Sequence, residues 1–138
     1  MATSFSKVNS FVEAVAEKVH NLGSDTLKLA FTNTAHTSTW TKLSDLTLAS
    51  GAPANLDSIT LTVSSSAQTD GTYKLVIADK TCTASGTVGP FRYIYIYNDS
   101  ASNDELIGYY DYGSAVTLES GDTFTVDFDG TNGVLTIA

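Results

Sequence analysis

Cysteine is almost absent from this sequence of 138 residues, and Cys82 is the only one. A single cysteine excludes a disulfide bond within the chain, which suits a reducing compartment such as a cytoplasm. We interpret Cys82 as a small, partly buried core residue, because no histidine lies near it in the sequence to activate the thiol.

Long apolar runs are also missing. No stretch reaches the roughly 18 apolar residues that a membrane-spanning helix needs. The first residues lack the apolar segment of a secretion signal, since Glu13 and Glu17 interrupt them. We therefore expect a protein that is made and used without export and does not bind a membrane.

Basic residues are scarce. Seven Lys and Arg stand against fifteen Asp and Glu, which gives a formal net charge of −8. Nucleic-acid binding depends on clustered Lys and Arg that displace phosphate counterions, and anionic membranes attract the same residues. The charge balance therefore argues against both partners.

The residue patterns of common enzymes do not occur either. The sequence has no nucleophile elbow, zinc-protease motif, phosphate loop or dinucleotide fingerprint. Its two histidines, His20 and His36, lie in unrelated contexts. Because no acid, base and nucleophile converge in the sequence, we expect neither enzymatic activity nor a cofactor.

One acidic segment, residues 127–132, is compatible with either a Ca²⁺ site or a turn. Asp127, Asp129 and Asn132 offer oxygen ligands, but their spacing does not match the EF-hand loop. Asp-Gly and Asn-Gly are also common turn formers because they tolerate positive φ. We favour the turn and expect no metal.

The N-terminal part of the sequence has a helical pattern. Apolar residues recur at spacings of three and four over residues 4–22, which predicts an amphipathic α-helix that ends near Gly23. One face of such a helix must be buried against the rest of the chain or against another chain.

The remainder, residues 26–138, consists of short alternating segments separated by turn signals. No strand alternates with a helix, so a parallel βαβ fold is not expected. The pattern predicts a single mainly β domain over residues 1–138, built as an antiparallel β-sandwich of jelly-roll-like topology with one N-terminal helix.

The segment FRYIYIY, residues 91–97, differs from the other predicted strands. Phe91 and the three tyrosines share one face by strand alternation, and Arg92, Ile94 and Ile96 share the other. Neither face suits water. The strand is therefore either central and covered by its own chain, or it contacts another subunit, since tyrosine is enriched at interfaces.

The same residues suggest where a partner would bind. We predict a protein–protein interface on the helix face and the tyrosine face, formed by Phe5, Val8, Phe11, Val12, Val15, Phe91, Tyr93, Tyr95, Tyr97, Tyr110 and Tyr112. An aromatic sugar-binding platform is an alternative, for which Asp111 and Arg92 would have to converge on the rings.

Several long phrases of the sequence resemble a known family. These are FSKVNSFVEAVAEKVHNLGSDTLKLAFTNT, SSAQTDGTYKLVIAD, GPFRYIYIYNDSASNDELIGYYDYGSAVTLESGDTF and TVDFDGTNGVLTIA. They are similar to small virion structural proteins of tailed bacteriophages, and the resemblance is weakest over residues 35–57. It rests on phrases and not on a catalytic motif, so it assigns no residue a role.

Within that family, the chain resembles capsid cement or decoration proteins. The resemblance implies binding to the outside of the assembled head, on particles assembled in the bacterial host cytoplasm. The implied partners are the major capsid protein and further copies of the chain itself, as a homodimer or homotrimer. A tail- or fibre-associated virion protein and a carbohydrate-binding β-sandwich used for adhesion are the alternatives.

Overall fold

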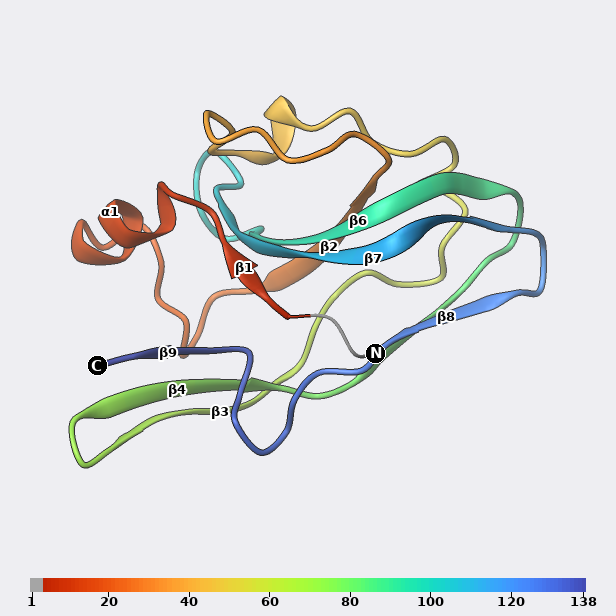
Figure 1. The fold of residues 1–138 in the computed structure, drawn as a ribbon. Helices are drawn as coiled ribbons and strands as arrows, with labels where there is room; N and C mark the ends of the chain where they lie inside the picture. The colour runs from red at the N-terminus through yellow and green to blue at the C-terminus, as the bar shows by residue number, and fades with distance from the viewer. Residues whose placement is uncertain (1–3) are drawn as a thin grey trace.

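The computed structural model describes residues 4–138 (Figure 1). Its elements follow one another along the chain as β1 (Ser6–Lys7), α1 (Phe11–Ala16), β2 (Leu27–Thr32), the 3₁₀ turn η1 (Leu43–Asp45), β3 (Val63–Thr69), β4 (Thr72–Ile77), β5 (Lys80–Thr83), β6 (Val88–Asn98), β7 (Leu106–Leu118), β8 (Thr123–Val126) and β9 (Leu135–Ile137).

The named strands form three antiparallel sheets. A four-stranded sheet has the order β1-β7-β6-β2, a three-stranded sheet the order β3-β4-β9, and β5 pairs with β8. In Figure 1 the four-stranded sheet occupies the upper part of the molecule and β3, β4 and β9 the lower part. The prediction of a mainly β, antiparallel fold with one helix is confirmed, whereas the sheets are not closed and the jelly-roll-like topology stays a prediction.

The N-terminal helix is much shorter than the sequence pattern predicts. Instead of residues 4–22, only Phe11–Ala16 is α-helical, and Ser6–Lys7 is a strand that pairs with β7. The Phe5 ring packs against Tyr110 at 5.3 Å between centroids, and Lys18 adopts a positive φ of 66° just beyond α1. Pairing with an open sheet edge has therefore replaced the helical turns on which the apolar spacing was based.

Glycine makes the pairing of β1 possible. A Cβ atom at Gly108 would overlap the Phe5 ring and lie 2.5 Å from the Ser6 carbonyl oxygen. The absence of a side chain at this position lets β1 and the Phe5 ring lie directly on β7.

The inner face of the four-stranded sheet forms most of the core. Leu29 pairs with Ile96 and Phe31 with Ile94, so the side chains of these four residues share one face, and all are at most 1% exposed. Phe124 of β8 packs on Phe31 at 6.3 Å between centroids, which joins this face to the β5–β8 pair.

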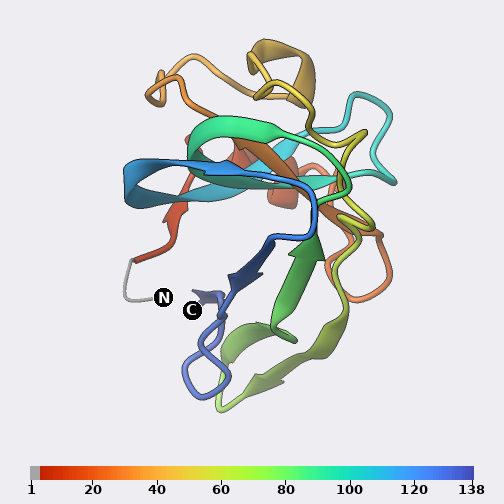
Figure 2. The same ribbon diagram turned by 90° about the vertical axis from the view of Figure 1, so that its right-hand side faces the viewer.

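A long loop of the same chain covers the opposite face of β6. Tyr95 is completely buried there, beneath His36 and Trp40 from the segment that follows β2. Figure 2 shows this segment, in orange and yellow, lying over β6. The strand is therefore central and covered on both faces by its own chain, the first of the two alternatives that its sequence allowed.

Phe91 does not share the tyrosine face. The β6–β7 ladder is irregular between Phe91 and Tyr93, and the Phe91 ring packs against Phe31 and Phe124 at 4.9 and 5.1 Å. The prediction that Phe91 aligns with the tyrosines was wrong, because this irregularity breaks the two-residue alternation.

The loop also satisfies the free edge of β2. Backbone N–H groups of Leu29 and Ala49 donate to the carbonyls of Ile59 and Phe31 at 2.9 and 2.8 Å, and Leu61 donates to Leu27 at 2.9 Å. These bonds protect an edge that would otherwise be open to other strands.

Candidate functional site

The aromatic residues of the sheet gather into one cluster, made of His36, Trp40, Tyr95 and Tyr109. The His36 ring stacks on Tyr109 at 4.5 Å, and its Nδ1 lies 2.8 Å from the Tyr95 hydroxyl. Burial raises the pKa of Tyr95 and lowers the pKa of His36. The Tyr95 ring also stacks on Tyr109, and the Trp40 ring meets His36 edge to face, so the rings contact one another within the chain.

Arg92 and Asp111 lie beside this cluster and pair with each other. The guanidinium donates from Nε and Nη2 to the two carboxylate oxygens at 2.8 and 3.1 Å, and it lies 5.4 Å from the centre of the Tyr93 ring. The arginine lowers the pKa of Asp111. The two residues that a sugar site requires do converge, but their hydrogen-bonding groups bind each other.

The predicted interface residues divide by exposure. Six are buried within the chain: Val8, Phe11, Phe91, Tyr95, Tyr97 and Tyr110. Phe5, Val15 and Tyr93 are half-buried. Val12 and Tyr112 are 57% and 41% exposed. A completely buried ring such as Tyr95 has no surface left for a partner, so only the last two groups are accessible.

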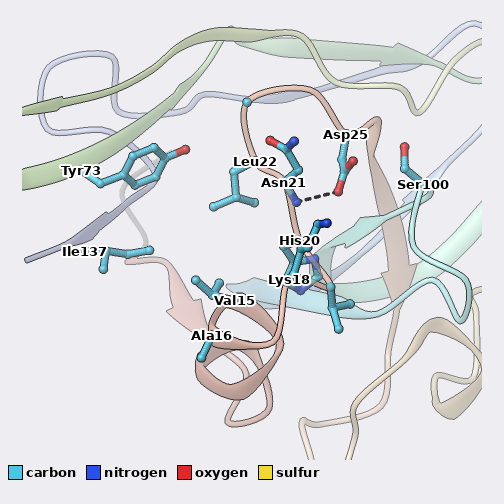
Figure 3. Close-up of a pocket in the computed structure, with 12 residues that line it drawn as sticks. Val15, Ala16, Lys18, His20, Asn21, Leu22, Asp25, Tyr73, Ser100 and Ile137 are labelled. Carbon is cyan, nitrogen blue, oxygen red and sulfur yellow. Dashed lines mark hydrogen bonds between the residues drawn. The ribbon is translucent and has the colours of Figure 1, made fainter.

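A groove lies beside the helix (Figure 3). It has a volume of about 640 Å³ and is lined by residues of α1, the segment after it, β4 and β9. Figure 3 shows Tyr73 and Ile137 on one side of the groove and Asp25 and Ser100 on the other. Ile137 is 39% exposed, and Val15 lines the groove beside it. Val12 lies one helical turn before Val15 on α1, outside the groove lining. Val12, Val15 and Ile137 are called the α1–β9 patch below.

The polar side of the groove is held by a buried hydrogen-bond network. The amide Nδ2 of Asn98 donates to Asp25 at 2.7 Å and lies 3.0 Å from Nδ1 of His20. An acceptor role for Nδ1 leaves the proton of a neutral imidazole on Nε2, and that atom is buried without a partner among the described residues.

Burial also sets the protonation of His20. The side chain is 7% exposed, and loss of hydration lowers the pKa of His20, against the opposing charges of Glu105 and Asp25. The ring stacks on Phe11 at 5.6 Å. The network therefore fixes the segment after α1 to the end of β6.

Two other candidates from the sequence have structural roles. Cys82 is completely buried, and burial raises the pKa of its thiol to about 11, which disfavours the reactive thiolate. The Asp129 carboxylate accepts hydrogen bonds from the backbone N–H groups of Thr131 and Asn132 at 2.9 and 2.8 Å, as expected for a turn.

The described residues, 4–138, contain no group of three or more His, Cys, Asp or Glu side chains arranged to hold a metal ion. Within the same range, no helix is both long and apolar enough to span a membrane.

Comparison of the chain with protein-family models, with curated proteins and with solved structures finds no match in any of the three.

Sequence reasoning missed Ile137 as an accessible residue. The segment that contains it is short and apolar, as a buried closing strand would be, and only the structure shows that β9 lies at the sheet edge beside the groove.

Proposed function

We propose that this chain is a structural protein of the tailed-bacteriophage virion, and within that group a capsid cement or decoration protein. The proposal is carried by the sequence resemblance. The resembling phrases coincide with the framework of the fold, since they include β1, α1 and β2, the β3–β4 hairpin, the β6–β7 pair, and β8 with β9. The segment of weakest resemblance, residues 35–57, belongs to the covering loop.

A binding role without chemistry is consistent with the side chains of the described residues. The rings of the aromatic cluster contact one another, Arg92 and Asp111 neutralise each other, and Cys82 is buried. The net charge of −8 favours a protein partner over nucleic acid. We therefore propose a protein without enzymatic activity, with a jelly-roll-like β-sandwich as its finer fold.

The mechanism of such a protein is mass action. A protein that binds only the assembled shell stabilises that state in proportion to its occupancy and affinity. Many identical copies on a symmetric lattice add their weak contacts, so that the shell becomes more resistant to disassembly.

The contact with the major capsid protein is assigned to the α1–β9 patch. Val12 has the largest exposed fraction, 57%, among the exposed large hydrophobic side chains of residues 4–138, and exposed apolar groups that lie together mark interaction surfaces. Two members of the patch, Val12 and Val15, belong to the interface predicted from the sequence.

The decisive experiment is the copy number of this protein relative to the major capsid protein in purified particles. A ratio of the same order as the shell subunit supports a cement protein on the capsid exterior. A few copies per particle would instead favour the tail or fibre alternative. Absence from the particles would contradict a virion role and return attention to carbohydrate binding, which a glycan array tests.

The contact surface has its own test. Val12→Asp and Ile137→Asp should lower the binding of the added protein to heads that lack it, without a change in Tm. Leu48→Asp is a matched control, because Leu48 is 37% exposed but belongs to the covering loop. Equal binding by all three variants would contradict this placement of the contact.

A further inference from the structure

Strand β3 is an open edge without charge. Its seven residues, Val63–Thr69, contain no Lys, Arg, Asp or Glu and no Pro. Edge strands of soluble proteins are usually protected by such residues or are covered. The three-stranded sheet has the order β3-β4-β9, so β3 is an edge strand of that sheet, and Figure 1 shows it in the lower part of the molecule.

The backbone groups that face outward from β3 can be identified from the ladder. Asp70 and Gly71 both have positive φ, 52° and 84°, which defines a two-residue type I′ turn between β3 and β4. The Leu75 carbonyl accepts a bond from Val134 at 2.7 Å, so it points away from β3. Leu75 pairs with Ser66, and by alternation the backbone groups of Ser66 and Gln68 point outward. No backbone bond to either residue is found among residues 4–138.

We propose that β3 pairs with β3 of a second copy of this chain, antiparallel and about a two-fold axis at Ala67. In this register Ser66 exchanges backbone hydrogen bonds with Gln68 of the partner copy, and Ala67 faces Ala67. The two three-stranded sheets then continue into one another as β9-β4-β3-β3-β4-β9. A two-fold axis satisfies the same groups on both copies.

The charge and the side-chain sizes of β3 are the reasons for choosing a second copy of the chain as its partner. Two chains of charge −8 repel each other, and the neutral residues of β3 allow them to approach without facing like charges. The register at Ala67 places the smallest side chain of β3 at the close contact on the axis, and it places Asp70 beyond the paired residues. On each side of the axis, Ser65 of one copy would face Thr69 of the other copy.

The biological setting of this pairing rests on the proposed function, in which copies associate on a capsid. The geometry of the pairing is independent of that function. The pairing is limited to a short strand and is therefore expected to be weak in solution. On a lattice that already holds neighbouring copies close together, the same contact would add to the capsid contacts.

Cysteine cross-linking tests the register directly. Residues that face each other in a non-hydrogen-bonded antiparallel pair have Cα atoms about 4.5 Å apart, within the range of disulfide geometry. Ala67→Cys should therefore give a covalent dimer under mild oxidation. Thr69→Cys is the control on the same face of the strand, since the two introduced thiols would lie about four residues, or roughly 13 Å, apart. Equal cross-linking of both variants, or of neither, overturns the register.

A proline pair tests the use of the edge without relying on a thiol. Gln68→Pro removes an outward N–H, which an edge strand tolerates. Thr136→Pro does the same at β9. The backbone groups of Tyr73 and Leu75 point toward β9, and Thr136 pairs with Lys74 between them, so the Thr136 N–H points to the outer side of β9. In sedimentation velocity, Gln68→Pro should raise the dimer Kd by about tenfold or more, as expected for lost backbone hydrogen bonds, and Thr136→Pro should not.

The outcomes separate the two proposals. A wild-type chain that stays monomeric at the highest concentration measured, or dimers that both proline variants weaken equally, overturns pairing through β3. If pairing through β3 is overturned but the protein is present on particles at a copy number like that of the shell subunit, the proposed function stands without this pairing. A dimer of the expected register with no copies on particles supports the pairing and contradicts the proposed function.

Discussion

The pairing of β1 with β7 can be tested by adding a single methyl group at Gly108. The long N-terminal helix predicted from apolar spacing would leave this position open, whereas in the structure a Cβ atom here overlaps the Phe5 ring and lies 2.5 Å from the Ser6 carbonyl oxygen. Gly108→Ala is therefore an overpacking substitution in a site that is buried.

The expected cost follows from the nature of the clash. Part of the clash is with the backbone carbonyl of Ser6, which cannot rotate away as a side chain can, so strand β1 has to shift. Overpacking of this kind costs about 1–3 kcal/mol. For a chain of this length each kcal/mol lowers the Tm by about 3–4 °C, which gives a decrease of about 3–12 °C.

The assay is thermal and urea unfolding of Gly108→Ala beside Gly130→Ala. Gly130 has open space around its Cβ position, so its substitution should change the free energy of unfolding by less than about 0.5 kcal/mol. Adding Phe5→Ala to Gly108→Ala removes the ring from the clash but not the Ser6 carbonyl, so the cost of Gly108→Ala should be smaller in that background. If both glycine variants unfold at the same temperature, β1 does not lie on β7.

Three further predictions concern buried polar groups. The pKa of His20 is lowered in the folded state, so the unfolded chain takes up the proton more readily. The contribution of His20 to the free energy of unfolding is therefore fully present above about pH 6.5 and is lost as the pH decreases through the pKa of the folded state. Urea titrations from pH 7 to 5 should therefore show a shallower loss of stability in His20→Gln than in the wild type, and parallel curves would show that His20 does not titrate on unfolding. Tyr95→Phe removes the hydroxyl that contacts His36 and should cost about 0.5–1.5 kcal/mol in equilibrium unfolding, whereas an unchanged midpoint would mean that this contact contributes nothing. Cys82, with a pKa of about 11 and no exposed surface, should react with a thiol reagent at pH 8 only after denaturation; rapid labelling of the folded protein would contradict its burial.

Much of the sheet was predictable from local patterns. The alternation of Leu27, Leu29 and Phe31, and of Phe124 and Val126, identifies core residues, although Ala30 and Thr32 on the other face of β2 are buried as well. The turn at Asp70-Gly71 follows from the left-handed conformation that these residues tolerate. Both features depend on neighbours along the chain, and for that reason they can be deduced from the sequence alone.

One strand lacks a local signal and one local prediction failed, for related reasons. The segment that includes Ser64–Gln68 has few of the residues that favour strands, yet it forms most of β3, because the turn and the apolar residues of β4 hold it in register. In the N-terminal segment the helical spacing was genuine, but Ser6 and Lys7 gain more from the edge of β7 than from another helical turn. In each case a partner element changes the preference of the segment.

The candidate site was the least predictable part. The residues Val12 and Val15 were identified from periodicity, whereas Ile137 joins them only because the last strand pairs with β4 beside the groove. The burial of Tyr95 was one of two open alternatives, and it depends on His36, which lies 59 positions away in the sequence.

The sequence by itself determined the acidic charge, the antiparallel β character, the turn between β3 and β4 and the apolar face of strands such as β4 and β8, because these properties depend on composition and on spacing of a few residues. Only the tertiary structure decided the length of the helix, the loop that covers the tyrosines, and the edge that β3 leaves open. Those features depend on which distant segments compete for the same surface, and local propensities of a fraction of a kcal/mol cannot resolve that competition.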